Sequence, residues 1–199
     1  MMQAVEELNG SLALANLMSV VWLGDWDRYE TIFKEMPVEL REQFPFHQYY
    51  NREEVEIWHE NHFFIPGQYF VSPYISSYSS NDGKDIEERR KNLLCLIGIY
   101  EKMGFYYPLE SNLYPDHIGC IMVFLSSLLQ EQIKANQESD EELYGKLVDL
   151  KNEVLADFIQ PILSPLQNHA MNNVKHLFIH EFIKYFCSTL GKEEIFSLS

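Results

Sequence analysis

The sequence predicts an all-α protein, folded as a single helical domain over residues 1–199. Apolar residues recur at helical spacing through most of the chain. No segment alternates strictly enough to require a strand, because the β-rich run Tyr69-Phe70-Val71 is short. The 199 residues are 46% hydrophobic and 14% aromatic, which is enough material for one sizeable core. No fixed-period repeat, low-complexity tract or obvious interdomain linker divides the chain.

The first third of the chain predicts a succession of helices. A long helix is expected from Val5 to about Leu23, and a second one from Trp26 to Met36, where Pro37 ends it. Residues 38–44 fit one or two further helical turns. Residues 53–62 fit a short amphipathic helix.

From Phe63 to Gly83 the chain reads FFIPGQYFVSPYISSYSSNDG, in which prolines and glycines interrupt a run of aromatic, serine and asparagine residues. No helical periodicity is present. Loops of this length inside a compact domain are usually functional or mobile. Because this one is so aromatic, we expect an ordered, functional loop.

Two helices follow this loop in the prediction. One runs from Asp85 to Met103, with Gly104 as its stop, and carries apolar residues at helical spacing. These residues are Ile86, Leu93, Leu94, Ile97 and Tyr100. The other runs from Pro115 to about Gln137, because Pro115 suits a first helical position and Asp116 places negative charge in the positive first turn. It has almost no polar face, so it should cross the centre of the bundle.

The last part of the chain predicts two more helices. Ser139-Asp140-Glu141-Glu142 resembles a capping box and opens a helix that Pro161 and Pro165 should bend. Its expected seam is Leu143, Leu147, Leu150, Val154 and Phe158. A final helix is expected from Met171 to Leu190, with Gly191 after it. The polar connection over residues 135–142 is long enough to serve as a hinge.

Thirty acidic residues against fifteen basic ones give a formal net charge of −15. This charge argues against nucleic acid or an anionic membrane surface as the partner, and it permits a basic peptide. Solubility alone is the simpler explanation of the charge. No cofactor is indicated, because the chain has no P-loop, no Gly-x-Gly-x2-Gly pattern and no Gly-x-Ser-x-Gly elbow.

The cysteines and the N-terminal residues favour a cytoplasmic protein. Cys95, Cys120 and Cys187 are far apart in apolar helical runs, so we expect buried free thiols in a reducing compartment. The apolar run over residues 12–23 follows two glutamates, and no Lys or Arg precedes Arg28, which is the wrong charge sign for a signal sequence. The run is also too short to span a bilayer.

Two sets of polar residues could carry chemistry. His176 and His180 stand four apart on a predicted helix, with Glu181 adjacent and His169 nearby, which is spacing that could share a metal. A helical His pair without further ligands is more often a partly buried polar contact, so we expect no metal. Asp116-His117 could act as an acid–base pair. Alternatively, Asp116 stabilises a helix start while His117 packs beneath a loop.

The order of several motifs resembles the TorD/DmsD/NarJ family of redox-enzyme maturation chaperones. The resemblance rests on Pro73-Tyr74-Ile75-Ser76-Ser77-Tyr78, a helical run ending in Gly104, then Pro115-Asp116-His117-Ile118 and a hydrophobic helix. It implies a TorD-like helical bundle and a cytoplasmic chaperone rather than an enzyme. Such a chaperone would bind the twin-arginine leader of a molybdopterin-containing oxidoreductase subunit and assist cofactor insertion before export.

The resemblance also implies the site and the partners. Its peptide-binding residues would be Tyr74, Ser76, Tyr78, Gly104, Pro115, Asp116 and His117. Its partners would be the leader peptide and the apo-form of the client, with no nucleic acid and no membrane insertion. The protein would be a monomer or a domain-swapped dimer. Two alternatives stay open, namely a NarJ-like assembly factor for a non-exported membrane-bound reductase and a small metal-dependent hydrolase.

Overall fold

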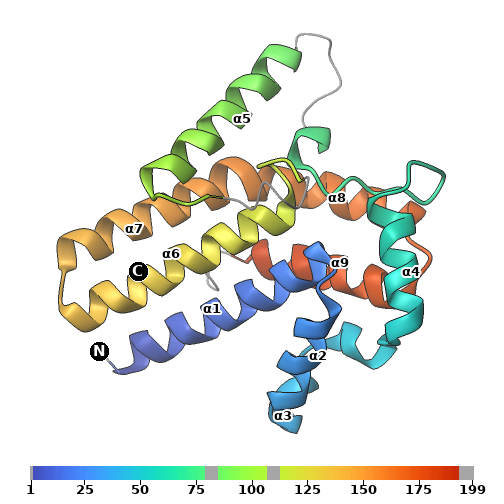
Figure 1. The fold of residues 1–199 in the computed structure, drawn as a ribbon, viewed down its shortest axis with the longest axis horizontal. Coiled ribbons are helices and arrows are strands. Elements are labelled where there is room, and N and C mark those ends of the chain that lie inside the picture. Colours follow the sequence, from blue (N-terminus) through green and yellow to red (C-terminus); the bar gives the residue numbers. More distant parts are fainter. Residues whose placement is uncertain (1, 79–84, 107–112, 193–199) are drawn as a thin grey trace.

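The computed structural model describes residues 2–78, 85–106 and 113–192, and these residues form a helical bundle that contains no strand (Figure 1). The all-α prediction is therefore confirmed. The α-helices are α1 Met2–Leu23, α2 Trp26–Glu35, α3 Val38–Arg41, α4 Arg52–Phe63, α5 Asp85–Lys102, α6 Ile118–Glu138, α7 Glu141–Val154, α8 Gln160–Asn173 and α9 Leu177–Leu190. The shorter elements are the 3-10 turns η1 Pro45–Tyr49 and η2 Ile75–Tyr78 and the π-helical turn η4 Leu155–Ile159.

Helix α6 lies at the centre of the bundle, as its composition predicted. Most of its apolar residues are buried, among them Ile121, Met122, Phe124, Leu125, Leu128 and Leu129. Helix α1 packs along one side of α6 and α7 along another (Figure 1). In the described residues, α6 is also the one helix long and apolar enough to cross a membrane, but 67% of that stretch is buried within the bundle. Contact with neighbouring helices accounts for its apolar surface.

An aromatic cluster fills the core between α1, α2, η1 and α9. Trp22 of α1 lies edge-on to Phe182 of α9, with ring centroids 5.6 Å apart. Phe46, which η1 places in the core, packs on Phe182 from the other side at 5.5 Å. The short turn η1 was not expected from the sequence. The buried Phe46 side chain anchors it.

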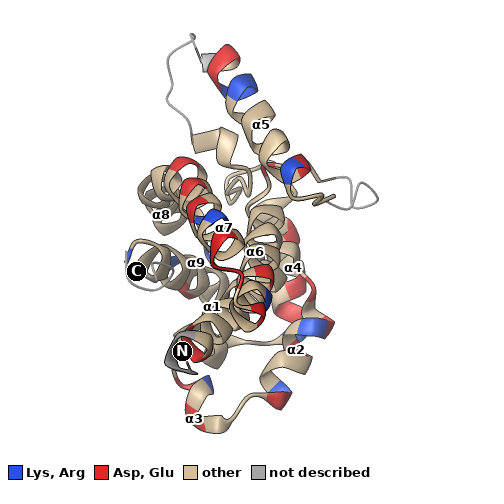
Figure 2. Cartoon of the chain, turned by 90° about the vertical axis from the view of Figure 1, so that its left-hand side faces the viewer, with Lys and Arg blue, Asp and Glu red and all other residues tan. Residues whose placement is uncertain are grey.

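Helix α5 differs from its prediction in what it buries. Leu96, Ile99 and Tyr100 pack into the core, but Ile86 is 78% exposed and Leu94 is 59% exposed. Cys95 is exposed as well, which corrects the expectation that all three cysteines are buried. The outer half of α5 projects from the bundle (Figures 1 and 2), so no described helix covers Ile86 or Leu94 there.

Three helix boundaries also differ from the prediction. Asp140, not Ser139, caps α7, because its carboxylate accepts the Leu143 N–H at 3.0 Å. Ser139 instead ends α6 in a left-handed conformation with φ 59°. The expected helix from Met171 to Leu190 is broken, since Val174 is extended and turns the chain between α8 and α9.

The expected proline bend takes the form of the π-turn η4. Pro161 lies in the first turn of α8, directly after η4, and Pro165 lies inside α8 without ending it. A proline offers no N–H to a carbonyl one turn earlier, and a π-turn is one way for a helix to accommodate that loss. Asp157 and Phe158 lie within this turn.

Histidines tie the aromatic loop to the bundle. His62 donates from Nδ1 to the Tyr69 carbonyl at 2.8 Å, and its Nε2 accepts the Lys175 N–H at 3.4 Å. His169 donates from Nε2 to the Phe70 carbonyl at 3.0 Å. The first half of the loop is therefore ordered, as expected. Residues 79–83, the last part of the expected loop, lie outside the described residues.

The turn after α1 gives a stability test. Gly24 has φ +69°, and a Cβ there would lie 2.8 Å from the His59 ring. We expect Gly24→Ala to lower the free energy of unfolding by about 2 kcal/mol or more, because it adds backbone strain to a steric clash. Gly10, inside α1, has nothing within 4 Å of its Cβ position. Gly10→Ala should raise the free energy by up to about 1 kcal/mol, and urea denaturation measures both. Equal effects would contradict this account.

Candidate functional site

The two segments that the sequence singled out lie side by side. Tyr74 and His117 form an isolated antiparallel bridge. The Ile118 N–H donates to the Pro73 carbonyl at 2.8 Å, and the Ile75 N–H donates to the Asp116 carbonyl at 3.1 Å. The aromatic loop is thus fixed across the start of α6.

Asp116 is almost buried, with 5% of its surface exposed. Its Oδ2 accepts the Ser76 N–H at 3.3 Å, so the carboxylate faces the loop and does not cap α6. Pro115 lies in the turn before α6 and not at its first position, and its carbonyl accepts the Tyr100 hydroxyl at 3.0 Å. Helix α6 therefore begins three residues later than predicted.

His117 supplies the cap of α6. Its Nδ1 accepts the Gly119 N–H at 3.0 Å, which places the ring proton on Nε2. Burial, with a smaller contribution from His59, lowers the pKa of His117 to about 4, so the ring is neutral. The Tyr74 ring packs on it at 5.2 Å. His117 thus packs beneath the loop, and it and Asp116 hydrogen-bond to different partners.

The two tyrosines of the loop have different surroundings. Tyr78 donates its hydroxyl to the Ser72 carbonyl at 2.7 Å, and burial raises its pKa above the ordinary value. Tyr74 is half-buried between His117 and Tyr114, whose ring lies 5.9 Å away. Only Tyr78 lines the cavity described below.

Gly104 has a backbone role. Its φ of +61° follows the last turn of α5, its N–H donates to the Glu101 carbonyl, and the Phe105 N–H donates to the Tyr100 carbonyl. This is a Schellman motif, which favours glycine. No described atom lies within 4 Å of a Cβ placed there. Gly104 therefore ends α5, as its sequence position predicted.

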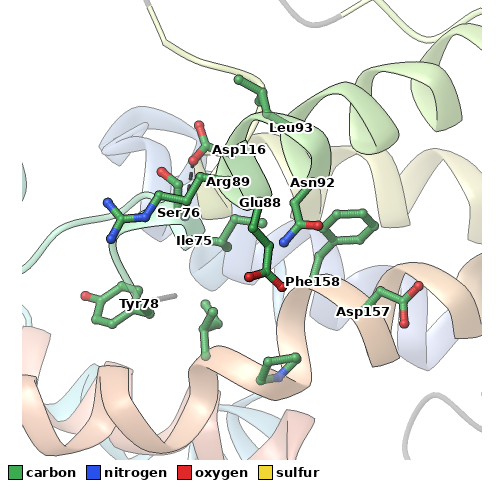
Figure 3. Close-up of a pocket in the computed structure, with 12 residues that line it drawn as sticks. Ile75, Ser76, Tyr78, Glu88, Arg89, Asn92, Leu93, Asp116, Asp157 and Phe158 are labelled. Carbon is green, nitrogen blue, oxygen red and sulfur yellow. Dashed lines mark hydrogen bonds between the residues drawn. The ribbon is translucent and has the colours of Figure 1, made fainter. Parts of the chain in front are cut away.

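A cavity of about 330 Å³ opens beside this junction (Figure 3). Its walls come from the aromatic loop, α5, the turn before α6, the π-turn η4 and the start of α8. The lining residues are Ile75, Ser76, Tyr78, Glu88, Arg89, Asn92, Leu93, Asp116, Asp157, Phe158, Pro161 and Ile162. Of the residues that the sequence pointed to, Ser76, Tyr78 and Asp116 line it, whereas Tyr74, Gly104, Pro115 and His117 do not.

Three carboxylates from three elements gather in this cavity. Asp116 lies on the inner wall, and the exposed Glu88 and Asp157 stand on α5 and η4. Phe158 and Tyr78 add aromatic surface, as Figure 3 shows. Sequence reasoning missed Glu88 and Asp157. The pair of prolines after Asp157 was a usable signal, because π-turns occur frequently at functional sites.

The histidines considered for a metal site do not gather. His176 faces Glu54, with Nε2 and Oε2 3.7 Å apart, and His180 faces Glu181 at 3.2 Å. His169 is bonded to a loop carbonyl instead. No group of three metal-ligating side chains occurs in residues 2–78, 85–106 and 113–192.

Comparison with known families places most of the chain in one family model. A family model described as "Nitrate reductase delta subunit" matches residues 31–166, a range that includes the aromatic loop and every residue lining the cavity. No solved structure matches the chain.

The buried histidines predict how stability depends on pH. Burial lowers the pKa values of His59 and His117 to about 4, below the ordinary 6.5. Between these values the unfolded chain binds protons that the folded chain does not. Their contribution is therefore complete above pH 6.5 and is lost as the pH falls toward 4, by on the order of 3 kcal/mol for each histidine.

The variant His117→Asn tests this prediction. Asparagine can still cap α6 but cannot titrate. We expect the loss of unfolding free energy between pH 7 and pH 4.5, measured by urea denaturation, to be clearly smaller than in the parent chain. An unchanged loss would show that His117 is not one of the groups that the fold keeps neutral.

Proposed function

The chain belongs to the nitrate reductase delta subunit family, and from this membership and the cavity beside Asp116 we propose that it is a cytoplasmic chaperone for a molybdopterin-containing oxidoreductase subunit. The family is one of molybdoenzyme maturation chaperones. The client would be held by an arginine-bearing segment near its N-terminus while it still lacks its cofactor. Reversible binding is enough for this function, and no bond needs to be made or broken.

The observation that carries the proposal is the convergence of Glu88, Asp116 and Asp157 on one cavity. A guanidinium forms charge-assisted hydrogen bonds to carboxylates and stacks on aromatic faces. The cavity offers both kinds of contact, since Tyr78 and Phe158 stand beside the acids. The net charge of −15, with acidic positions spread over α4, α5 and α7 (Figure 2), adds long-range attraction for a basic segment.

The size of the cavity limits what enters it. At about 330 Å³ it is at the lower end of ligand pockets, so it would take one arginine side chain and not a folded segment. The apolar part of a leader would lie against the partly buried Leu93 in the cavity wall. Ser76, Tyr78 and Asp116 would contact the client directly.

The remaining residues of the predicted site would not contact the client but would hold the loop and the turns around the cavity in place. Tyr74 and His117 hold the loop on α6, and Pro115 sets the turn that carries Asp116. Gly104 would act only by ending α5. Changes at these four positions should affect the client through the stability of the loop.

A second candidate is an assembly factor for a reductase that is not exported, which the name of the matched family favours. Its client segment would not need paired arginines. The two candidates differ in the peptide that binds and not in the cavity. A requirement for two arginines in the bound peptide would therefore favour an exported client.

Substitutions at the cavity mouth test the site. We expect Glu88→Gln or Asp157→Asn to weaken binding of a synthetic peptide, two consecutive arginines followed by an apolar stretch, by about tenfold, because each removes a charged acceptor. Glu87→Gln and Glu153→Gln are matched controls, since these exposed acids lie outside the cavity. Fluorescence anisotropy measures the affinity.

The controls decide between the outcomes. Equal weakening by the cavity and control variants would show that net charge alone attracts the peptide, and the cavity would lose its role. A version of the peptide with lysines in place of the arginines should bind more weakly. Equal affinity for a peptide without basic residues would favour the assembly factor for a non-exported client.

A further inference from the structure

An arginine of the chain itself lines the same cavity. We propose that Arg89 of α5, in the wall of the arginine-binding cavity, pairs with the cavity's carboxylates while no client is bound, so that a client arginine must compete with it for them. This inference rests on the proposed function and adds a regulatory element to the same site. Arg89 is the one Lys or Arg among the described residues that line the cavity, and its side chain runs from α5 toward Ser76 and Tyr78 (Figure 3).

The burial of α5 points to the same arrangement. In its outer half, over residues 86–95, only Arg89 and Leu93 are partly buried, and both line the cavity. The neighbouring Arg90 and Lys91 are exposed. The Arg89 Nε atom is buried, although long basic side chains normally extend their charged ends into water. Arg89 therefore lies inward, together with Leu93, on a helix segment that is otherwise exposed.

Charge supplies the reason for this position. Glu88, Asp116 and Asp157 line one small cavity, and Asp116 is nearly buried. Negative charges that line one small cavity repel one another, and a guanidinium beside them lowers that repulsion. Arg89 would supply this positive charge while no client is bound.

The position of α5 makes exchange feasible. The outer half of α5 projects from the bundle (Figure 1), and only the inner half, through Leu96, Ile99 and Tyr100, is held in the core. Arg89 could leave the cavity by a change of rotamer or a small tilt of this segment, without disturbing α6. The chain would then bind client arginines, and other weak ligands of the cavity, less tightly than a chain without Arg89.

The first test measures the affinity of the arginine peptide for Arg89→Ala and for Arg90→Ala. Both variants change the net charge equally, but only the first removes a residue from the cavity. We expect Arg89→Ala to bind up to about tenfold more tightly than Arg90→Ala, as for carboxylates that are paired with Arg89 about nine times in ten. Equal or weaker binding by Arg89→Ala would overturn the proposal, because Arg89 would then be neutral or would help to bind the client.

The second test needs no peptide. We expect Arg89→Ala to melt at a lower temperature than Arg90→Ala, and millimolar methylguanidinium to raise the melting temperature of Arg89→Ala alone. The same rise in both variants, or in neither, would overturn the inference that Arg89 pairs with the cavity's carboxylates. Rescue by methylguanidinium together with no binding of any peptide would keep this inference and remove the proposed function.

Discussion

The site depends on the short antiparallel pairing between residues 73–75 and residues 116–118. The first N–H groups of a helix have no partner within the helix, and at a buried helix start they must find one elsewhere. For α6 the Pro73 carbonyl accepts the Ile118 N–H and the His117 ring accepts the Gly119 N–H. The loop is therefore part of the cap of the central helix. Its aromatic and acidic side chains are positioned by the same bonds that stabilise α6.

The cavity follows from this junction. Once the loop is fixed over the start of α6, Asp116 and Tyr78 form one wall, and α5 with η4 provides the others. The π-turn matters because it lies where Pro161 interrupts normal helical bonding and places Asp157 and Phe158 together. Three separate features of the chain thus supply one concave surface. None of them would form it alone.

Much of the fold could be predicted because the apolar pattern of a buried helix is fixed by what surrounds it, and most of α6 is covered by neighbouring helices. The pattern was less informative for α5. Periodicity shows which residues share a face but not whether another helix covers that face, and Ile86 and Leu94 are exposed. Helix boundaries were predicted wrongly where two neighbouring residues could each cap the helix, as Ser139 and Asp140 can at the start of α7. The extended Val174 carried no glycine or proline to signal the break.

The site was predictable only in part for a related reason. Asp116 and Tyr78 belong to motifs that are recognisable in the sequence, but Glu88 and Asp157 are ordinary helix-surface acids whose proximity arises from tertiary packing. One of the two interpretations of His117 placed it beneath the loop, yet its capping bond to Gly119 depends on the ring orientation. The sequence pattern thus predicted the wall that carries Asp116 and Tyr78. The wall that carries Glu88 and Asp157 could be found only in the three-dimensional structure.

The exposure of Cys95 has a practical consequence. Cys120 and Cys187 are buried, and burial raises the pKa of both thiols, to about 11 and about 12, so neither reacts readily at neutral pH. A maleimide dye added to the unaltered chain would therefore attach to the projecting helix. This helix carries a natural attachment point for an optical reporter, and its motion could be followed in solution without engineering a cysteine.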